Sequence, residues 1–174
     1  MPKSDRESLS VALAQLIHDA GGRVVGRTRL QKMACLLDIA GYHKGFEFEY
    51  RHFGPYSELL YDVSKFAAAE GKIDEEEKQT NWGGWYSIFE AHGVGSGDAG
   101  QIALARKMVD ADLIQLELAV TAAFLAYQGE EHPWEETTAR KANKATPDRL
   151  EAAKEFYREL RVTYATPDPL PQIA

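Results

Sequence analysis

The segment from Arg27 to Leu60 constrains the fold more than any other, because two capped helical patterns flank an aromatic run within it. Thr28 and Gln31 have the spacing of a capping box, in which each side chain bonds the other residue's backbone. The apolar residues that follow recur at helical spacing and stop at Gly41. This pattern predicts a helix from about residue 28 to residue 40.

The second half of this segment predicts a strand and another helix. Aromatic and charged residues alternate over residues 46–51, which is the period-two pattern of a half-buried strand. Gly54-Pro55 is expected to end that strand. Ser57 then has the position of a helix N-cap, and Gly71 the position of a terminator. We therefore expect a third helix between Ser57 and Gly71.

The flanking sequence predicts a helix before this segment and a hairpin after it. Apolar residues at helical spacing from Leu9 to Ala20 end at Gly21-Gly22. The acidic run Asp74 to Glu77 is interpreted as a solvated turn. It precedes an aromatic strand over residues 85–89. Lys72-Ile73 is the candidate partner of that strand.

The C-terminal part predicts three helices behind a flexible connection. Apolar periodicity from Leu113 to Tyr127 predicts a long helix, and Pro133 and Pro147 each have the position of a first-turn proline. The prolines of the tail after residue 165 predict an extended, mobile end.

These elements predict an α+β fold that is mainly α. The expected architecture is a winged-helix-like core with a small antiparallel hairpin, followed by a C-terminal helical subdomain. The expected boundaries are the core at 1–92, a Gly-rich hinge at 93–100, the helical subdomain at 101–165 and the Pro-rich tail at 166–174.

Charge and composition limit the compartment and the partners. The formal net charge is −7 and the isoelectric point is near 5.3, so diffuse attraction to nucleic-acid phosphates is absent and a basic partner is favoured. The single cysteine, Cys35, excludes an internal disulfide. No apolar run is long enough to span a membrane. We expect a soluble, cytoplasmic protein with no membrane partner.

No pattern in the sequence specifies a reaction. The segment Gly95 to Gly100 formally fits G-x-G-x-x-G, but no second parallel strand follows it, so we expect no nucleotide there. The histidines lie on separate elements without metal-ligand spacing. His52 beside the Gly54-Pro55 turn favours a structural role over a catalytic one. We therefore expect no catalytic residues, no metal, no cofactor and no enzymatic activity.

Two stretches carry a resemblance to a known family. RTRLQKMACLLDIAG followed by FEYRHFGPYSELLYD, and later PWEETTARK, resemble the bacterial YwgA-type proteins and the Panacea domain of SocA-like antitoxins. The resemblance covers roughly residues 9–160. It implies direct binding of a partner protein, such as a toxin or the client of a proteolytic adaptor. It also implies structural roles for the matching motif residues, which are Leu30, Gln31, Lys32, His52, Gly54, Pro55, Ser57 and Trp134.

Two hypotheses of function remain open at this point. The first is a non-enzymatic protein-interaction module, an antitoxin or adaptor, and a homodimer is left open. Its expected partner-binding residues are Glu58, Tyr61, Asp62, Lys65, Trp82, Trp85 and Tyr86. The alternative is a winged-helix DNA-binding transcriptional regulator. Its candidate phosphate contacts are Arg23, Arg27, Arg29 and Lys32.

Overall fold

The computed structural model describes residues 2–42 and 45–174, and this part of the chain forms seven helices and five short strands. The α+β fold, mainly α, is confirmed, whereas its winged-helix character stays a prediction. In chain order the elements are α1 (Lys3–Asp19), β1 (Arg23–Val25), α2 (Arg27–Ile39), β2 (Glu49–Arg51), β3 (Gly54–Tyr56), α3 (Glu58–Ala69), β4 (Ile73–Gln79), β5 (Trp85–Ala91), α4 (Ala99–Val109), α5 (Leu113–Tyr127), α6 (Pro133–Arg140) and α7 (Pro147–Thr163).

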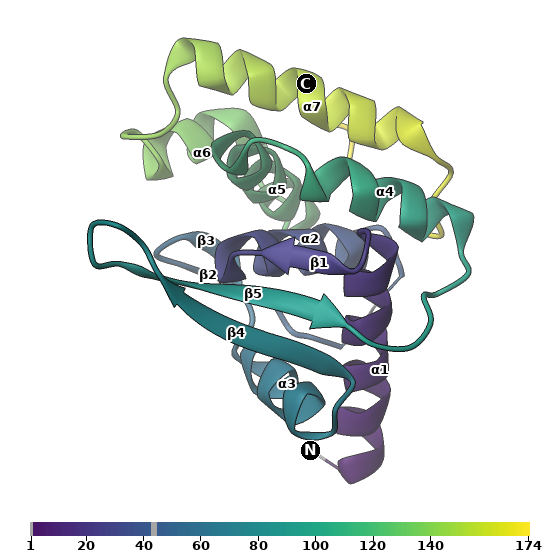
Figure 1. Ribbon diagram of the computed structural model, residues 1–174. Coiled ribbons are helices and arrows are strands. Elements are labelled where there is room, and N and C mark those ends of the chain that lie inside the picture. The colour runs from purple at the N-terminus through teal and green to yellow at the C-terminus, as the bar shows by residue number, and fades with distance from the viewer. Residues whose placement is uncertain (1, 43–44) are drawn as a thin grey trace.

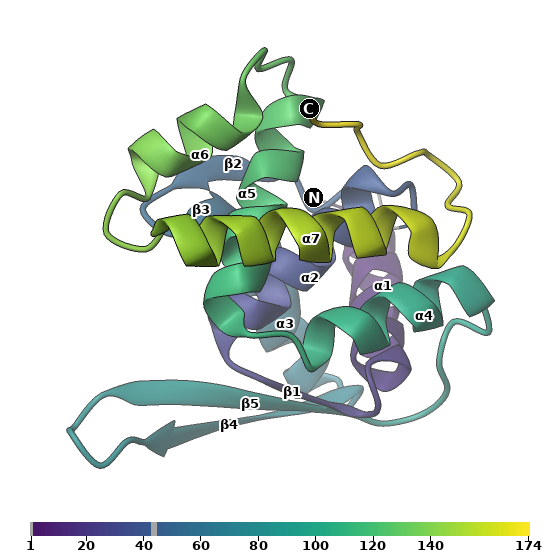
Figure 2. The same ribbon diagram turned by 90° about the horizontal axis from the view of Figure 1, so that it is seen from above.

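The strands form two small antiparallel sheets. One has the order β1-β5-β4, so β5 lies in the middle, and the other is the β2–β3 hairpin (Figure 1). In the first sheet Val24 is opposite Phe89, and Ile73 is opposite Ala91 at the other side of β5. The free end of the β4–β5 hairpin extends well beyond the helices (Figure 2). The predicted hairpin is therefore present, and its tip projects from the molecule.

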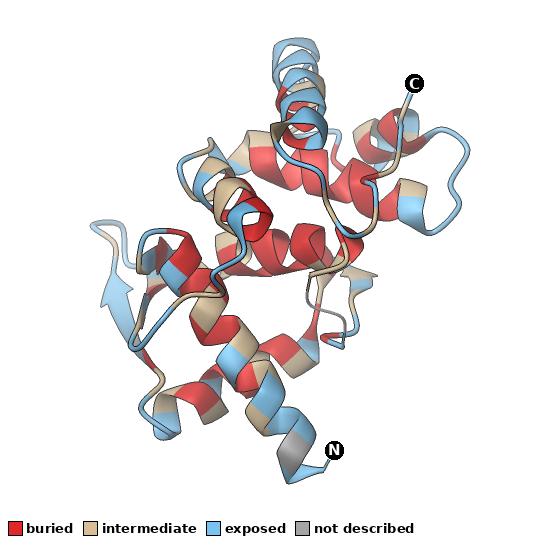
Figure 3. Ribbon diagram, turned by 90° about the vertical axis from the view of Figure 1, so that its right-hand side faces the viewer, coloured by how far each residue is buried: buried red, intermediate tan, exposed pale blue. Residues whose placement is uncertain are grey.

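The core is continuous through both halves of the chain. Helices α2 and α5 pack against each other, with α4 against α2 and with α6 and α7 against α5. Helix α1 packs against α3 and α4. Every residue of α5 from Leu116 to Leu125 is buried, because neighbouring helices cover it on several sides. Figure 3 shows the buried residues concentrated where the helices meet. The first-turn prolines predicted at Pro133 and Pro147 do begin α6 and α7.

The predicted capping box at the start of α2 is wrong. The N-cap is Gly26, whose φ of 98° suits glycine, and Thr28 lies inside the first turn. Gln31 does not bond back to the helix start, because its amide is occupied by the backbone of Ser57. The predicted cap of α3 is confirmed: the Ser57 hydroxyl accepts a hydrogen bond from Leu60 N–H at 3.0 Å.

The aromatic run forms less strand than its alternation predicts. Only Glu49–Arg51 is extended and paired, and Phe46 is buried before the strand begins. Glu47 adopts a φ of 57°, which interrupts the two-residue period. Gly54-Pro55 does not end the strand in a loop, since β3 begins at Gly54 and pairs back on β2.

The acidic run is not a turn. Asp74 to Glu77 lie within β4, where they pair in register with β5 from Glu90 back to Ser87. The turn comes later, where Thr80 N–H bonds Gly84 C=O. Charged residues are tolerated in β4 because it is an edge strand in which Asp74, Glu76 and Glu77 are exposed.

Two segments expected to be mobile pack against the body of the protein. In the Gly-rich segment, the buried Asp19 carboxylate accepts bonds from Ser96 N–H at 3.1 Å and from the Gln101 amide at 2.8 Å. In the tail, Leu170 is buried and the Tyr157 hydroxyl donates to Pro171 C=O. The tail forms neither a helix nor a strand, and these contacts hold it in place.

Candidate functional site

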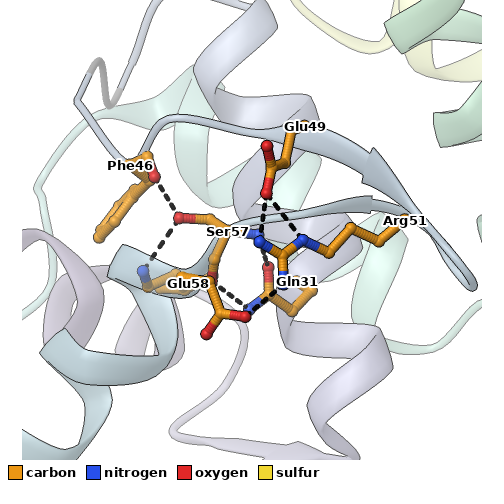
Figure 4. A network of polar contacts seen from close by, with 7 residues as sticks. Gln31, Phe46, Glu49, Arg51, Ser57 and Glu58 are labelled. Atoms are coloured by element: carbon orange, nitrogen blue, oxygen red, sulfur yellow. Dashed lines mark hydrogen bonds and ion pairs between the residues drawn. The ribbon is translucent and has the colours of Figure 1, made fainter.

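Gln31 and Ser57 meet at one place, although they are far apart in the sequence. Gln31 of α2 bonds both backbone groups of Ser57, as Nε2 donates to the Ser57 carbonyl and Oε1 accepts from the Ser57 N–H, each at 2.9 Å (Figure 4). The Ser57 hydroxyl donates to Phe46 C=O and caps α3. The motif therefore fixes the β2–β3 hairpin and the start of α3 against α2.

Lys32 is a buried part of this network. Its side chain is fully enclosed, and Nζ donates to Pro55 C=O at 2.8 Å. Burial disfavours the charged ammonium and lowers the pKa of Lys32 to about 8. Lys32 cannot act as the surface phosphate contact that the sequence suggested.

A second buried lysine lies close to the first and is paired with a carboxylate. Glu117 of α5 is 2% exposed and accepts bonds from Lys141 Nζ at 2.7 Å and Lys144 Nζ at 2.9 Å. Burial raises the pKa of Glu117, but the bonds from both lysines outweigh it and the net pKa is lowered. Sequence reasoning did not find this cluster, because Glu117 lies within an otherwise apolar helical pattern.

Gly54 is held tightly above this cluster. Its φ is 90°, and a Cβ added there would lie 2.8 Å from Thr121 Oγ1 and 3.4 Å from Lys141 Nζ. The Thr121 hydroxyl is buried without a hydrogen-bond partner among the described residues. Only glycine allows the β2–β3 hairpin to approach α5 this closely.

A surface hollow of about 570 Å³ lies over this region, lined by Tyr50, Arg51, His52 and Arg140. The Arg140 guanidinium lies 4.4 Å from the centre of the Tyr50 ring, and Arg51 is paired with both Glu49 and Glu58 (Figure 4). His52 is exposed, and within the described residues its ring makes no hydrogen bond, so the structural role predicted for it finds no support here. Trp134 is buried edge-on against Tyr157, which accounts for its place in the motif by packing.

The proposed phosphate contacts do not form one basic surface. Arg27 is paired with Glu75, and Arg29 donates to Ala111 C=O at 2.7 Å at the opposite side of α2. Arg23 Nε lies 3.5 Å from Glu90 Oε1, and the Lys32 side chain is buried. The pattern that looked like a basic cluster is dispersed because α2 directs its side chains to different surroundings.

The expected partner-binding residues lie on α3 and on the β4–β5 hairpin, close to one another but not all on one face. Trp85 and Tyr86 are consecutive in a strand, so their side chains point to opposite faces of the sheet. Trp85 is opposite Gln79 and shares the face of Glu75 and Phe89. Tyr86 is opposite Lys78 on the other face.

The α3 side of this surface is linked to the hairpin by charged and aromatic contacts. Glu75 accepts from Arg27 and from Lys65 Nζ, the latter at 2.9 Å. The Arg27 guanidinium lies 4.6 Å from the centre of the Tyr61 ring. These contacts fix the half of the hairpin around Glu75, its near half, to α3. They do not include its far half, which contains the turn at residues 80–84.

The far half carries the most exposed aromatic residues. Trp82 is 85% exposed and Trp85 is 67% exposed. Beside Trp85 is a hollow of about 410 Å³ whose walls include Arg27, Glu77, Tyr86 and Leu113. We define the hairpin surface as Trp82, Trp85, Tyr86, Glu76 and Glu77 together with Tyr61 and Lys65 of α3.

Neither a protein-family model nor a curated protein sequence matches this chain. Among the described residues, no group of histidine, cysteine, aspartate and glutamate side chains has the geometry to hold a metal ion. No helix in that part of the chain is both long enough and apolar enough to cross a membrane.

Proposed function

We propose that this chain works by binding a partner protein directly through the hairpin surface, without catalysing a reaction. The observation that carries the proposal is the exposure of Trp82 and Trp85 on a projecting hairpin. Tryptophan is among the side chains that contribute most to binding when a partner covers them, and exposed apolar groups on a monomer favour association. The hairpin surface therefore has the composition of an interface.

The charge of the surface specifies the kind of partner. Asp74, Glu76 and Glu77 are exposed along β4, and the whole chain has a net charge of −7. Such a surface attracts a basic protein and repels phosphate backbones. The resemblance of residues 27–62 to SocA-like antitoxins adds a class to this chemistry. We propose an antitoxin or adaptor whose partner is a toxin or a client protein with a basic binding site.

The experiment is capture of the partner from native cells at physiological salt, with identification by mass spectrometry and nucleic-acid analysis. The tagged parent is compared with Trp85→Ala and with Tyr61→Ala. Val162→Ala is the matched control, because Val162 is 81% exposed on α7 and is not part of the hairpin surface. Thermal unfolding of each variant verifies that it remains folded.

The proposal expects one dominant protein at fixed stoichiometry that the two hairpin-surface variants lose and the control retains. Equal capture by all variants would place the interface elsewhere and contradict the proposal. Co-purifying DNA without a protein would replace it with the regulator hypothesis.

A further inference from the structure

We propose that the outer edge of β4 is a docking site for an extended, basic segment of the partner, which adds to the sheet as a further strand. This inference rests on the proposed function and specifies how the partner is held. Three features of β4 support it. Some backbone groups of this strand point away from β5, acidic side chains flank them, and these charges exclude a second copy of the chain.

The hydrogen bonds at the two ends of the hairpin identify the outward-facing groups. Thr80 N–H donates to Gly84 C=O at 2.7 Å, and His92 N–H donates to Lys72 C=O at 2.9 Å. In an antiparallel pair, bonded and non-bonded positions alternate along the strand. Asp74, Glu76 and Lys78 therefore direct their backbone groups toward β5.

The intervening residues of β4 direct theirs away from β5. On the same alternation the backbone N–H and C=O groups of Glu75, Glu77 and Gln79 point to the outer edge. Among the described residues β4 has no strand neighbour except β5. The side chains of Glu76 to Gln79 are all exposed, so this part of the edge is open to solvent.

The flanking charges select the incoming segment. β4 contains four carboxylates, Asp74 to Glu77, and one lysine. Glu75 is already paired with Arg27 and Lys65, while Glu77 has no ion-pair partner in the described part of the chain. Opposite charges facing each other across adjacent strands are favourable, and like charges are not. A strand with lysine or arginine at alternate positions would pair with this edge.

The same charges exclude a second copy of this chain as the occupant. Two β4 edges placed side by side would bring acidic runs into contact, and charged edge strands are one means by which proteins avoid self-association. Trp82 lies in the turn, and Trp85 lies on β5 opposite Gln79, so both are near the end of β4, where they can cover an apolar residue of the incoming strand. The occupant is therefore a basic segment with an apolar residue near the hairpin tip.

Amide hydrogen exchange measured by NMR tests the geometry before any ligand is added. The free protein should exchange Glu77 and Gln79 amides quickly and protect those of Glu76 and Lys78. The probe is then a blocked seven-residue peptide of alternating lysine and valine, compared with its glutamate counterpart. The lysine peptide should protect Glu77 and Gln79 and bind more weakly as salt increases, while the glutamate peptide should have no effect.

Two substitutions at one position separate the backbone contribution from the charge. Glu77→Pro removes an outward N–H that β5 does not use, so the hairpin should persist and peptide affinity should fall about tenfold. Glu77→Thr removes the same charge and retains the N–H, so its affinity should fall less. Glu76→Pro is the folding control, since its N–H faces β5 and its loss should open the hairpin.

Several results would overturn the inference. These are protection of Glu77 and Gln79 in the free protein, no added protection by the lysine peptide, or equal binding by the Pro and Thr variants. Capture of a protein partner that depends on Trp85 but is unaffected by Glu77→Pro would reject strand addition and leave the proposed function intact.

Discussion

Gln31 bonds the backbone of Ser57 through both atoms of its amide, in the way a neighbouring strand would, at 2.9 Å for each bond. Both residues are buried. Gln31→Ala leaves two buried backbone groups without partners, so we expect the free energy of unfolding to fall by about 2–4 kcal/mol. Urea titration measures this loss, and the exposed Gln128→Ala should change it by less than about 0.5 kcal/mol. Similar losses for both variants would contradict the interpretation.

Gly54 and Gly83 have nearly the same backbone conformation but different surroundings. Their φ angles are 90° and 89°, yet a Cβ at Gly54 meets Thr121 and Lys141, whereas a Cβ at Gly83 meets nothing within 4 Å. Alanine at either position incurs the backbone strain of a positive φ, and only Gly54→Ala adds overpacking. We expect Gly54→Ala to cost about 1–3 kcal/mol more than Gly83→Ala in thermal or urea unfolding. Equal costs would mean that the hairpin moves away from α5 freely.

Lys32 gives the stability a defined dependence on alkaline pH. Burial lowers its pKa from 10.5 to about 8 in the folded protein, so between these values the unfolded chain binds more protons. The burial of Lys32 therefore lowers the free energy of unfolding most below pH 8. That free energy should rise by about 3 kcal/mol in total as the pH increases from 8 to 10.5. The measurement is urea unfolding of the parent and Lys32→Met from pH 7.5 to pH 10. Parallel curves for the two proteins would refute this role of Lys32.

Glu117 neutralises the buried Lys141 and the partly exposed Lys144. Glu117→Gln leaves Lys141, which is 4% exposed, without its carboxylate, so we expect a loss of about 3–5 kcal/mol in unfolding free energy. Glu151→Gln is the control, since it removes an exposed pair with Lys154, and it should leave stability nearly unchanged.

The carboxyl group of Glu117 also predicts behaviour in acid. Its folded pKa is lowered from 4.5, so the stabilisation is complete above that value and is lost as pH falls through the folded pKa. Acid unfolding of Glu117→Gln should lack this contribution. A variant that unfolds in parallel with the parent below pH 4.5 would contradict the assignment.

Local signals predicted six of the seven described helices and missed α4, which begins within the Gly-rich segment, and they predicted the strands poorly. The first-turn prolines of α6 and α7 and the serine cap of α3 are side-chain or φ constraints that act within a few residues. β1 has only three residues and exists because Val24 pairs with Phe89 far along the chain. The extent of β4 likewise depends on β5, so an acidic run that resembles a turn becomes a strand.

The candidate site likewise depends on contacts between residues far apart in the chain, which local signals do not predict. Exposure of Trp82 and Trp85 follows from the projection of the hairpin, and their residue type alone allowed either a core or an interface position. A lysine in a helical pattern is normally solvated, so the sequence alone predicts that Lys32 lies on the surface with the neighbouring arginines. Its burial results from the close approach of Pro55, which depends on Gly54 packing against α5.

The packed tail has a consequence for the order in which this chain can fold. Asp168 N–H bonds Ala40 C=O at the end of α2, and the buried Leu170 lies against the core. Residue 40 leaves the ribosome long before residue 168. During synthesis the Ala40 carbonyl at the end of α2 therefore lacks its hydrogen bond from Asp168 until the tail has been made. Residues 168–170 therefore complete a structure begun much earlier in synthesis, and a nascent chain in which these residues are still inside the ribosome cannot form it.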